Sequence, residues 1–245
     1  MNELSILNLP YQADLSTHYQ SLCHLPGFVL LESTNQKWGR YDIATAYPYQ
    51  RLKLSSQNHR IAEAFKTIQS HLSHPSKPCE LPFQGGAIGY ISYDFAAEMA
   101  GIHSKKHPLL ADLPILNLGF YDWAIIADHL QKKVYLIAAN QQPDTRFIIE
   151  EILARWHHPP DELTFCLKKS FAPIVSKDDY QASFNAIYED LKKGRAYQVN
   201  LTQPFIAECS GDSWMFYRRV SRKNPTPYAA FLRLDNAEMI SFSPE

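Results

Sequence analysis

Three segments in this sequence of 245 residues have residue types and spacings that could serve chemistry or ligand binding. The basic run Arg218–Lys223 could meet an anionic ligand, but on a chain of balanced charge such a run is more often a solvated helix end. His157 and His158 are adjacent, and adjacent side chains on a helix do not face one point, so no metal is expected there. The glycine-rich segment 85–89 lacks the spacing of a dinucleotide-binding loop and indicates a strand where backbones approach closely.

The sequence lacks the motifs of several common enzyme classes: the phosphate-binding loop, the His-Glu-x-x-His helix, the nucleophile elbow and the calcium loop. Its 24 basic and 25 acidic residues nearly cancel, which argues against a dedicated nucleic-acid binder. No segment approaches the roughly 18 apolar residues of a membrane helix, so we expect a soluble cytoplasmic protein without a membrane partner. Four widely spaced cysteines are expected to be reduced thiols: Cys23, Cys79, Cys166 and Cys209.

Hydrophobic patterns in the first two thirds of the chain predict strands and helices in alternation. The apolar run 27–33 predicts a mostly buried strand, and the apolar stripe within 58–72 predicts a surface helix. Two runs rich in β-branched and aromatic residues, 121–127 and 134–138, predict an antiparallel hairpin. A broad apolar face predicts a further helix after Asp144, which can cap it, and two prolines end that helix.

The last third of the chain contains the most clearly delimited helix. Ser176 begins it in the manner of a capping box, and Gly194 stands where a left-handed stop is needed. The alternating segment 197–202 predicts a strand with one apolar and one polar face. A short helix after Asp212 and a hairpin formed by two runs within 228–243 complete the pattern.

Strands dominate this order of elements, and at least two hairpins occur among them. We therefore expect an α+β protein built on antiparallel sheet and not a doubly wound parallel sheet. A weak organisational break falls in the connector 161–173. It divides the chain into two expected regions, 1–160 and 161–245.

The segment GRAYQVNLTQ at 194–203 resembles the corresponding segment of the chorismate-utilising enzyme family, and within it the component I proteins of the aminodeoxychorismate synthase branch of para-aminobenzoate and folate synthesis. Four further segments occur in the family's order: LLES at 30–33, GGAIGYISYD at 85–94, NPTPYAAFL at 224–232 and SFSPE at 241–245. The resemblance implies a sandwich of antiparallel sheets with helices outside, of the anthranilate synthase component I type. Residues 161–245 would then begin the chorismate-binding domain.

Glu245 matches the family's active-site glutamate, and the resemblance assigns it an acid–base role in replacing a hydroxyl of chorismate; a solvated carboxylate without a role is the alternative. The chain stops there, before the family's Pro-Ile-Lys-Gly-Thr segment and the glutamates that hold magnesium. The resemblance therefore implies an incomplete, truncated sandwich that is inactive alone. It also implies Mg²⁺ in the whole enzyme, with metal ligands after Glu245 and none within these residues.

Gln198 indicates which nucleophile the reaction uses. Family members that use water carry a lysine base at this position, and a neutral amide cannot take a proton from water. The resemblance thus implies ammonia, although an ordinary polar residue on a strand is the alternative interpretation. The run Asn200–Gln203 resembles the aminodeoxychorismate branch, and anthranilate synthase component I is the alternative. Ammonia implies a separate glutamine amidotransferase subunit as partner, because no Cys–His–Glu pattern of that chemistry is present.

Six positions match residues that line a tryptophan pocket in this family, a feedback site in anthranilate synthase and a structural site in the aminodeoxychorismate branch. A serine hydroxyl for the polar end of tryptophan and apolar walls for its indole suit that ligand. One alternative is that these residues only end a strand and form a turn, and bind nothing. Another is that the chain is a tryptophan-binding regulatory module and not an enzyme. The six positions are Glu32, Ser33, Arg40, Tyr41, Pro227 and Tyr228.

Overall fold

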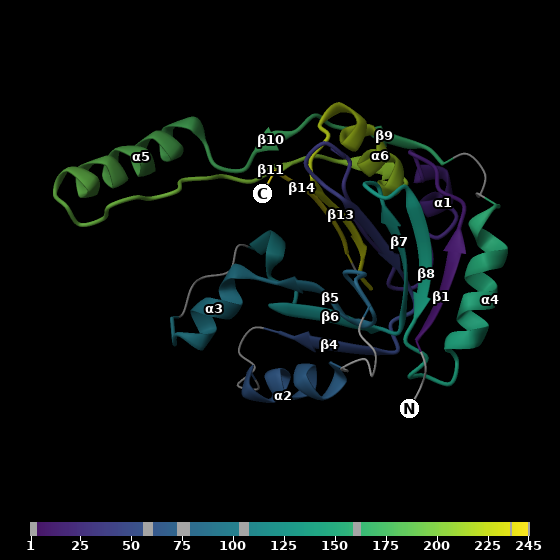
Figure 1. The fold of residues 1–245 in the computed structure, drawn as a ribbon. Coiled ribbons are helices and arrows are strands. Elements are labelled where there is room, and N and C mark those ends of the chain that lie inside the picture. The colour runs from purple at the N-terminus through teal and green to yellow at the C-terminus, as the bar shows by residue number, and fades with distance from the viewer. Residues whose placement is uncertain are drawn as a thin grey trace. The chain divides into compact units, whose positions relative to one another are not determined.

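The computed structural model describes residues 4–55, 61–72, 79–102, 108–158, 163–235 and 237–244 (Figure 1). The chain forms two compact units, one of Met1–Asp161 with Phe216–Glu245 and one of Glu162–Met215. The sequence places a second region at 161–245, whereas in the structure the residues after Met215 belong to the first unit. The reason is that the last two strands of the chain pair with the sheet of that unit.

The first unit is built on an antiparallel sheet of seven described strands. One of its pairings joins an early segment of the chain to a late one, because Leu30 lies opposite Phe231. The remaining pairs are also antiparallel, and the pair of Trp123–Asp128 with Lys133–Ala138 is the hairpin that the sequence predicts. In spatial order the strands are β1 (Ser5–Leu9), β8 (Lys133–Ala138), β7 (Trp123–Asp128), β3 (Tyr41–Thr45), β2 (Val29–Glu32), β13 (Tyr228–Arg233) and β14 (Glu238–Ser243).

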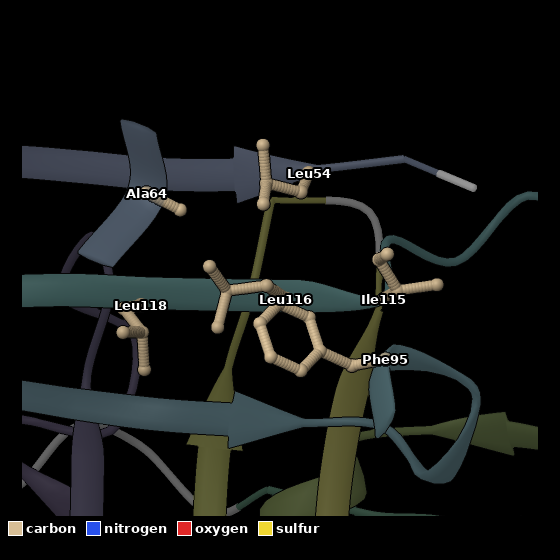
Figure 2. Close-up of a cluster of buried hydrophobic side chains, with 6 residues drawn as sticks. All are labelled: Leu54, Ala64, Phe95, Ile115, Leu116 and Leu118. Carbon is tan, nitrogen blue, oxygen red and sulfur yellow. The ribbon is translucent and has the colours of Figure 1, made fainter. Parts of the chain in front are cut away.

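A second, three-stranded antiparallel sheet has helices α2 (Ile61–His71) and α3 (Tyr93–Met99) beside it. Its strands, in spatial order, are β4 (Gln50–Leu54), β6 (Leu116–Tyr121) and β5 (Gly86–Ile91). Figure 2 shows the apolar cluster that joins these elements: Leu54, Ala64, Phe95, Ile115, Leu116 and Leu118.

The two sheets share an apolar cluster. Val29 and Leu232 of the large sheet pack with Tyr121 and Ile88 of the small one. The Tyr121 hydroxyl also donates a hydrogen bond to the carbonyl oxygen of Gly27 at 2.8 Å. Removing this apolar surface from water is the main force that holds the sheets together. The predicted α+β fold with packed antiparallel sheets is confirmed.

Helices cover the other face of the large sheet. Helix α6 (Ser213–Lys223) contributes Tyr217, whose ring lies 5.7 Å from Phe231 between centroids. Helices α1 (Ser16–Gln20) and α4 (Thr145–Trp156) contact each other through His18, which stacks on Trp156 at 4.7 Å. Asp144 stands at the N-cap of α4, as predicted, but its side chain accepts no capping hydrogen bond.

The second unit contains two short strand pairs and one long helix. Strand β9 (Phe165–Leu167) pairs with β12 (Cys209–Gly211), and β10 (Ala172–Pro173) pairs with β11 (Phe205–Ile206). Helix α5 (Lys177–Lys192) begins at Ser176, whose hydroxyl accepts the backbone N–H of Asp179 at 3.1 Å. The strand predicted at 197–202 is not found, because no described strand lies beside this segment to supply backbone hydrogen bonds.

Candidate functional site

Glu245 and Gln198 are the two residues predicted for the reaction. Glu245 is outside the described residues. Gln198 is exposed and lies in the second unit, between helix α5 and strand β11. All six predicted pocket positions belong to the first unit. The site can therefore be built from the first unit alone.

Three of the six predicted pocket residues meet at Gly39, in the turn between strands β2 and β3. The Ser33 hydroxyl donates a hydrogen bond to the carbonyl oxygen of Tyr41 at 2.8 Å. A Cβ atom at Gly39 would lie 2.5 Å from Ser33 Oγ and 2.9 Å from the carbonyl oxygen of Pro227. Only glycine permits this close approach without a shift of its neighbours. The turn thus brings Ser33, Tyr41 and Pro227 close together.

Arg40 fixes the start of the same strand. Its guanidinium donates three hydrogen bonds to Asp128, the shortest at 2.7 Å, and lies 4.6 Å from the centroid of the Tyr41 ring. Burial raises the pKa of Asp128, but hydrogen bonds from Arg40 and from the backbone of Gln131 and Leu130 outweigh this effect. The pKa of Asp128 is therefore lowered. Arg40 is thus held by strand β7 and orients the ring of Tyr41.

Strand register shows which predicted residues share a face of the large sheet. Leu31 lies opposite Ile43 on β3 and opposite Ala230 on β13. Tyr41 and Tyr228 stand two positions from these partners, and side chains two positions apart point to the same face. The two tyrosines therefore lie on the face that carries Leu31, which is the face toward the small sheet. The side chain that follows Leu31 points the other way.

Glu32 is that following residue, and its carboxylate is buried on the helix-covered face. The Arg218 guanidinium donates to both of its oxygens, at 2.8 and 3.1 Å, and the Tyr217 hydroxyl donates to one at 2.5 Å. A second nitrogen of Arg218 lies 3.4 Å from Asp14. Burial raises the pKa of Glu32, Arg218 opposes this and the charge of Asp42 adds to it, so the pKa is raised. Glu32 is thus separated from the two tyrosines.

Asp42 forms a second buried centre on this face. Its carboxylate accepts the backbone N–H of Ser33 and the Tyr19 hydroxyl, each at 2.9 Å, and lies 2.9 Å from His129 Nε2. The other ring nitrogen of His129 is hydrogen-bonded to the Tyr11 hydroxyl at 3.2 Å. Burial lowers the pKa of His129, but the hydrogen bond and charge of Asp42 outweigh it, so the pKa is raised. The Asp42 carboxylate on β3 therefore connects His129, in the turn after β7, to the backbone of Ser33 at the end of β2.

A pocket of about 250 Å³ opens between these two charged centres and the C-terminal half of α6. We call it the mixed-charge pocket, because its walls carry three carboxylates and two guanidinium groups. Of the six positions that the sequence predicts for one pocket, only Glu32 and Ser33 line it. Its walls comprise Ala13, Asp14, Leu15, Glu32, Ser33, Thr34, Gln36, Asp42, Arg218, Ser221, Arg222 and Pro225.

Sequence reasoning missed Arg218. The basic run that contains it is predicted to be a solvated helix end, but the Arg218 side chain is only 10% exposed and the prediction is wrong for this residue. The signal that could have found it is helical spacing, because Arg218 lies four residues after the buried Trp214 and three before the buried Ser221. Asp42 and His129 carry no comparable signal, since only the pairing of β3 with β7 brings them together.

Two searches of the structure return nothing within the part of the chain that it describes. No group of three or more histidine, cysteine, aspartate or glutamate side chains there could hold a metal ion. No described helix is both long and apolar enough to cross a membrane.

Comparisons with known proteins place these features in a family. The family model described as "chorismate binding enzyme" matches residues 27–245. "Aminodeoxychorismate synthase component 1" of Salmonella typhimurium is 32% identical over 261 residues, which cover 98% of this chain and 56% of the relative. The protein of the same name from Escherichia coli is 31% identical, with the same two coverages. The chain thus spans about half the length of these curated relatives.

A sequence match to an anthranilate synthase covers less of the chain, whereas a structural match covers nearly all of it. "Anthranilate synthase component 1" of Lactococcus lactis is 27% identical and covers 68% of this chain and 38% of the relative. The crystal structure of anthranilate synthase component I from Streptococcus pneumoniae superimposes with a TM-score of 0.74 at 21% identity, covering 98% of this chain and 58% of that one. At this level of identity the superposition supports the fold alone.

Proposed function

This chain belongs to the chorismate-binding enzyme family, and from that membership we propose that it forms part of component I of an aminodeoxychorismate synthase. In the proposed reaction, chorismate and ammonia give 4-amino-4-deoxychorismate, which leads to para-aminobenzoate and folate. The observation that carries the proposal is identity above 30% across 98% of the chain with relatives of that name. Anthranilate synthase component I is the second candidate, supported by 27% identity with a relative of that name over 68% of this chain.

Residue roles in the reaction follow the family motif. We assign Glu245 the acid–base role at the departing hydroxyl of chorismate. Gln198 supports ammonia as nucleophile, because an amide side chain does not remove a proton from water. A glutamine amidotransferase subunit is proposed to supply the ammonia, in agreement with relatives that are named as component 1 of an assembly. The proposed location of the assembly is the cytoplasm.

Magnesium is proposed for the whole enzyme, where it would hold the carboxylates of chorismate. The described residues do not fit such a site, so the proposed ligands lie elsewhere in the whole protein. No step of the reaction is assigned to the metal in this unit. The first unit supplies the antiparallel sheet that strands β13 and β14 complete.

Tryptophan binding is a separate proposal for the face of the large sheet toward the small sheet. Ser33, Arg40, Tyr41, Pro227 and Tyr228 would form the pocket. Glu32 would support it from the opposite face, through its anchoring of helix α6. The supporting observations are the shared face of the two tyrosines and the meeting of three of these residues at Gly39. Whether tryptophan regulates the enzyme or fills a structural site, the same residues would contact it.

Calorimetry with L-tryptophan tests that pocket. The 245-residue chain should bind tryptophan, and Tyr228→Ala should weaken binding about tenfold through loss of an aromatic wall. Tyr93→Ala is the matched control, because Tyr93 is exposed on α3 and is not among the proposed pocket residues. Absence of binding heat and of any thermal shift would remove the tryptophan proposal.

A chimera tests the main proposal. The portion of the Escherichia coli relative that aligns with this chain is replaced by the chain itself, and the purified chimera is incubated with chorismate, ammonium and Mg²⁺. We expect 4-amino-4-deoxychorismate as the product, whereas the 245 residues alone should give no turnover. A folded chimera that forms anthranilate would favour the second candidate. Robust activity of the 245 residues alone would contradict the claim that further groups are required.

A further inference from the structure

The mixed-charge pocket is distinct from the pocket proposed for tryptophan. Glu32 and Asp42 enter it from positions next to Leu31 and Ile43. Because neighbouring residues of a strand point to opposite faces, these two carboxylates lie on the helix-covered face of the sheet. The proposed tryptophan pocket lies on the other face, with Tyr41 and Tyr228. Of the residues proposed to contact tryptophan, only Ser33 also lines the mixed-charge pocket, so the two sites can be tested through their other residues.

The charged side chains of the pocket differ in how far neighbouring groups of the protein neutralise them. Arg218 is held by Glu32 and lies 3.4 Å from Asp14, so its positive charge is largely committed within the protein. Arg222 is exposed and lines the pocket, and its charge acts on Asp14, where it helps to lower the pKa of that carboxyl. The Asp14 carboxylate is 64% exposed at the rim. One carboxylate and one guanidinium group thus face the same opening with capacity for further hydrogen bonds.

The buried part of the pocket favours a positive group. Glu32 and Asp42 are close enough for the charge of one to raise the pKa of the other. A carboxylate oxygen can accept two hydrogen bonds, and each of these carboxylates has one oxygen with a single bond from the described residues. A primary ammonium group is a compact cation with three donors, and it would reduce the repulsion between the two carboxylates.

The walls also limit the rest of the ligand. Apart from Leu15, Ala13 and Pro225, the residues that line the pocket are polar or charged, and no aromatic ring is among those described. Sites for bulky apolar ligands are lined mainly by hydrophobic and aromatic side chains. The pocket therefore suits a small polar molecule better than an indole.

We propose that the mixed-charge pocket binds a small polar amino acid, with the ammonium group at the carboxylates and the carboxylate at Arg222. The geometry supplies both charges of such a ligand from one opening. The assignment rests on the first unit alone and holds whether or not the chain takes part in chorismate amination.

Backbone amide shifts of Thr34 and Ser221 in nuclear magnetic resonance titrations report binding at this pocket, because both residues line it and neither is among the residues proposed for tryptophan. The probes are L-serine, its methyl ester, N-acetyl-L-serine and L-tryptophan. L-Serine should shift these amides in a saturable manner. The ester lacks the carboxylate and should bind about tenfold more weakly, while N-acetylation removes the ammonium charge and should abolish saturation. L-Tryptophan should not compete with L-serine.

Two exposed substitutions test the contacts without disturbing the core. Arg222→Gln should weaken L-serine about tenfold and leave the ester unchanged, whereas Asp14→Asn should weaken both. Arg219→Gln is the matched control, because Arg219 is an exposed arginine of the same helix that does not line the pocket. Unchanged amide shifts elsewhere establish that each variant is folded.

Four outcomes would overturn the proposal. They are the absence of saturable shifts with L-serine, equal binding of L-serine and its N-acetyl form, equal effects of Arg222→Gln and Arg219→Gln, and displacement of L-serine by L-tryptophan.

Discussion

Glu32 and Arg218 form a buried ion pair between residues 186 positions apart in sequence, each side chain only 10% exposed. A buried charge that loses its partner is destabilising by several kcal/mol, because the remaining ion is left without compensation in a poorly solvated site. This pair therefore connects helix α6 to the large sheet, and removing either charge should lower the stability of the fold.

Glu32→Gln should lower the free energy of unfolding by about 3 to 5 kcal/mol, because a neutral amide removes a charge that compensates the buried Arg218 guanidinium. Glu150→Gln is the matched control, since Glu150 is 60% exposed and pairs with Arg146 on the helix surface, and should cost less than about 1 kcal/mol. Urea denaturation measures both. Equal losses in the two variants would show that the Glu32 pair is not a buried, partnered centre.

His129 should make stability depend on pH. Its pKa is raised in the folded state, chiefly by Asp42 against the effect of burial, and Glu32 and Asp128 add smaller contributions. The resulting stabilisation is complete below the unfolded pKa of histidine, near 6.5, and is lost as the pH rises through the folded pKa. Tyr11, at the other ring nitrogen, is neutral over this range because its own pKa is raised.

Melting temperatures measured between about pH 5.5 and pH 9 test this dependence. The native chain should lose stability as the pH rises, and His129→Gln should remove that component of the loss. His24→Gln is the control, because His24 is exposed, and it should retain the native profile. A profile that is the same in all three proteins would contradict the role given to the Asp42–His129 pair.

Sequence patterns indicate the position of some of these side chains and not of others. The turn that gathers Ser33, Tyr41 and Pro227 follows from motifs of the family, and the structure brings these residues together at Gly39. The opposite orientation of Glu32 depends on which residue of β2 faces the small sheet. Motif matching assigns neighbours in sequence to one pocket, whereas the pleat of a strand separates them. Register was therefore the missing information.

Among the elements, strand β5 depends on glycine. A Cβ atom at Gly89 would lie 2.0 Å from the carbonyl oxygen of Asn117 and 2.9 Å from the Cα of Leu118, both on β6. The sequence-based interpretation of segment 85–89 as a strand with close backbone approach is thus confirmed. Backbone atoms of a paired strand cannot move aside as a flexible side chain can.

Gly89→Ala should lower the free energy of unfolding by about 2 kcal/mol or more, because the added methyl group overlaps the backbone of β6. Ile91→Ala is the control on the same strand. Ile91 is 56% exposed, and its truncation should cost less than about 1 kcal/mol. Chemical denaturation of the two variants would contradict the packing account if Gly89→Ala proved no worse than the control.

The elements that local chemistry defines were predictable, and those that need a distant partner were not. The β7/β8 hairpin and helix α5 each follow from local turn or cap residues, and both are present. Segment 197–202 alternates as a strand should, yet Tyr197 is fully exposed and no described strand pairs with this segment. Alternation indicates the capacity to form a strand, but pairing requires a neighbour.

At the scale of the whole molecule, the two ends of the first unit meet in one sheet. Strands β13 and β14 follow β2 in spatial order, although about 200 residues separate them in sequence. The sequence divides the chain near residue 161, and contacts among the described residues return the segment after Met215 to the first unit. A single boundary in the sequence cannot describe this arrangement, because the last segment joins the first unit through pairing between strands that are far apart in sequence.

The central claim is that this chain contributes to an enzyme that replaces a hydroxyl of chorismate with ammonia. The most direct measurement is mass spectrometry of the product that the chimera forms from chorismate and ¹⁵N-ammonium. We predict 4-amino-4-deoxychorismate with one ¹⁵N atom. A hydroxylated product without ¹⁵N from a folded chimera would contradict the claim.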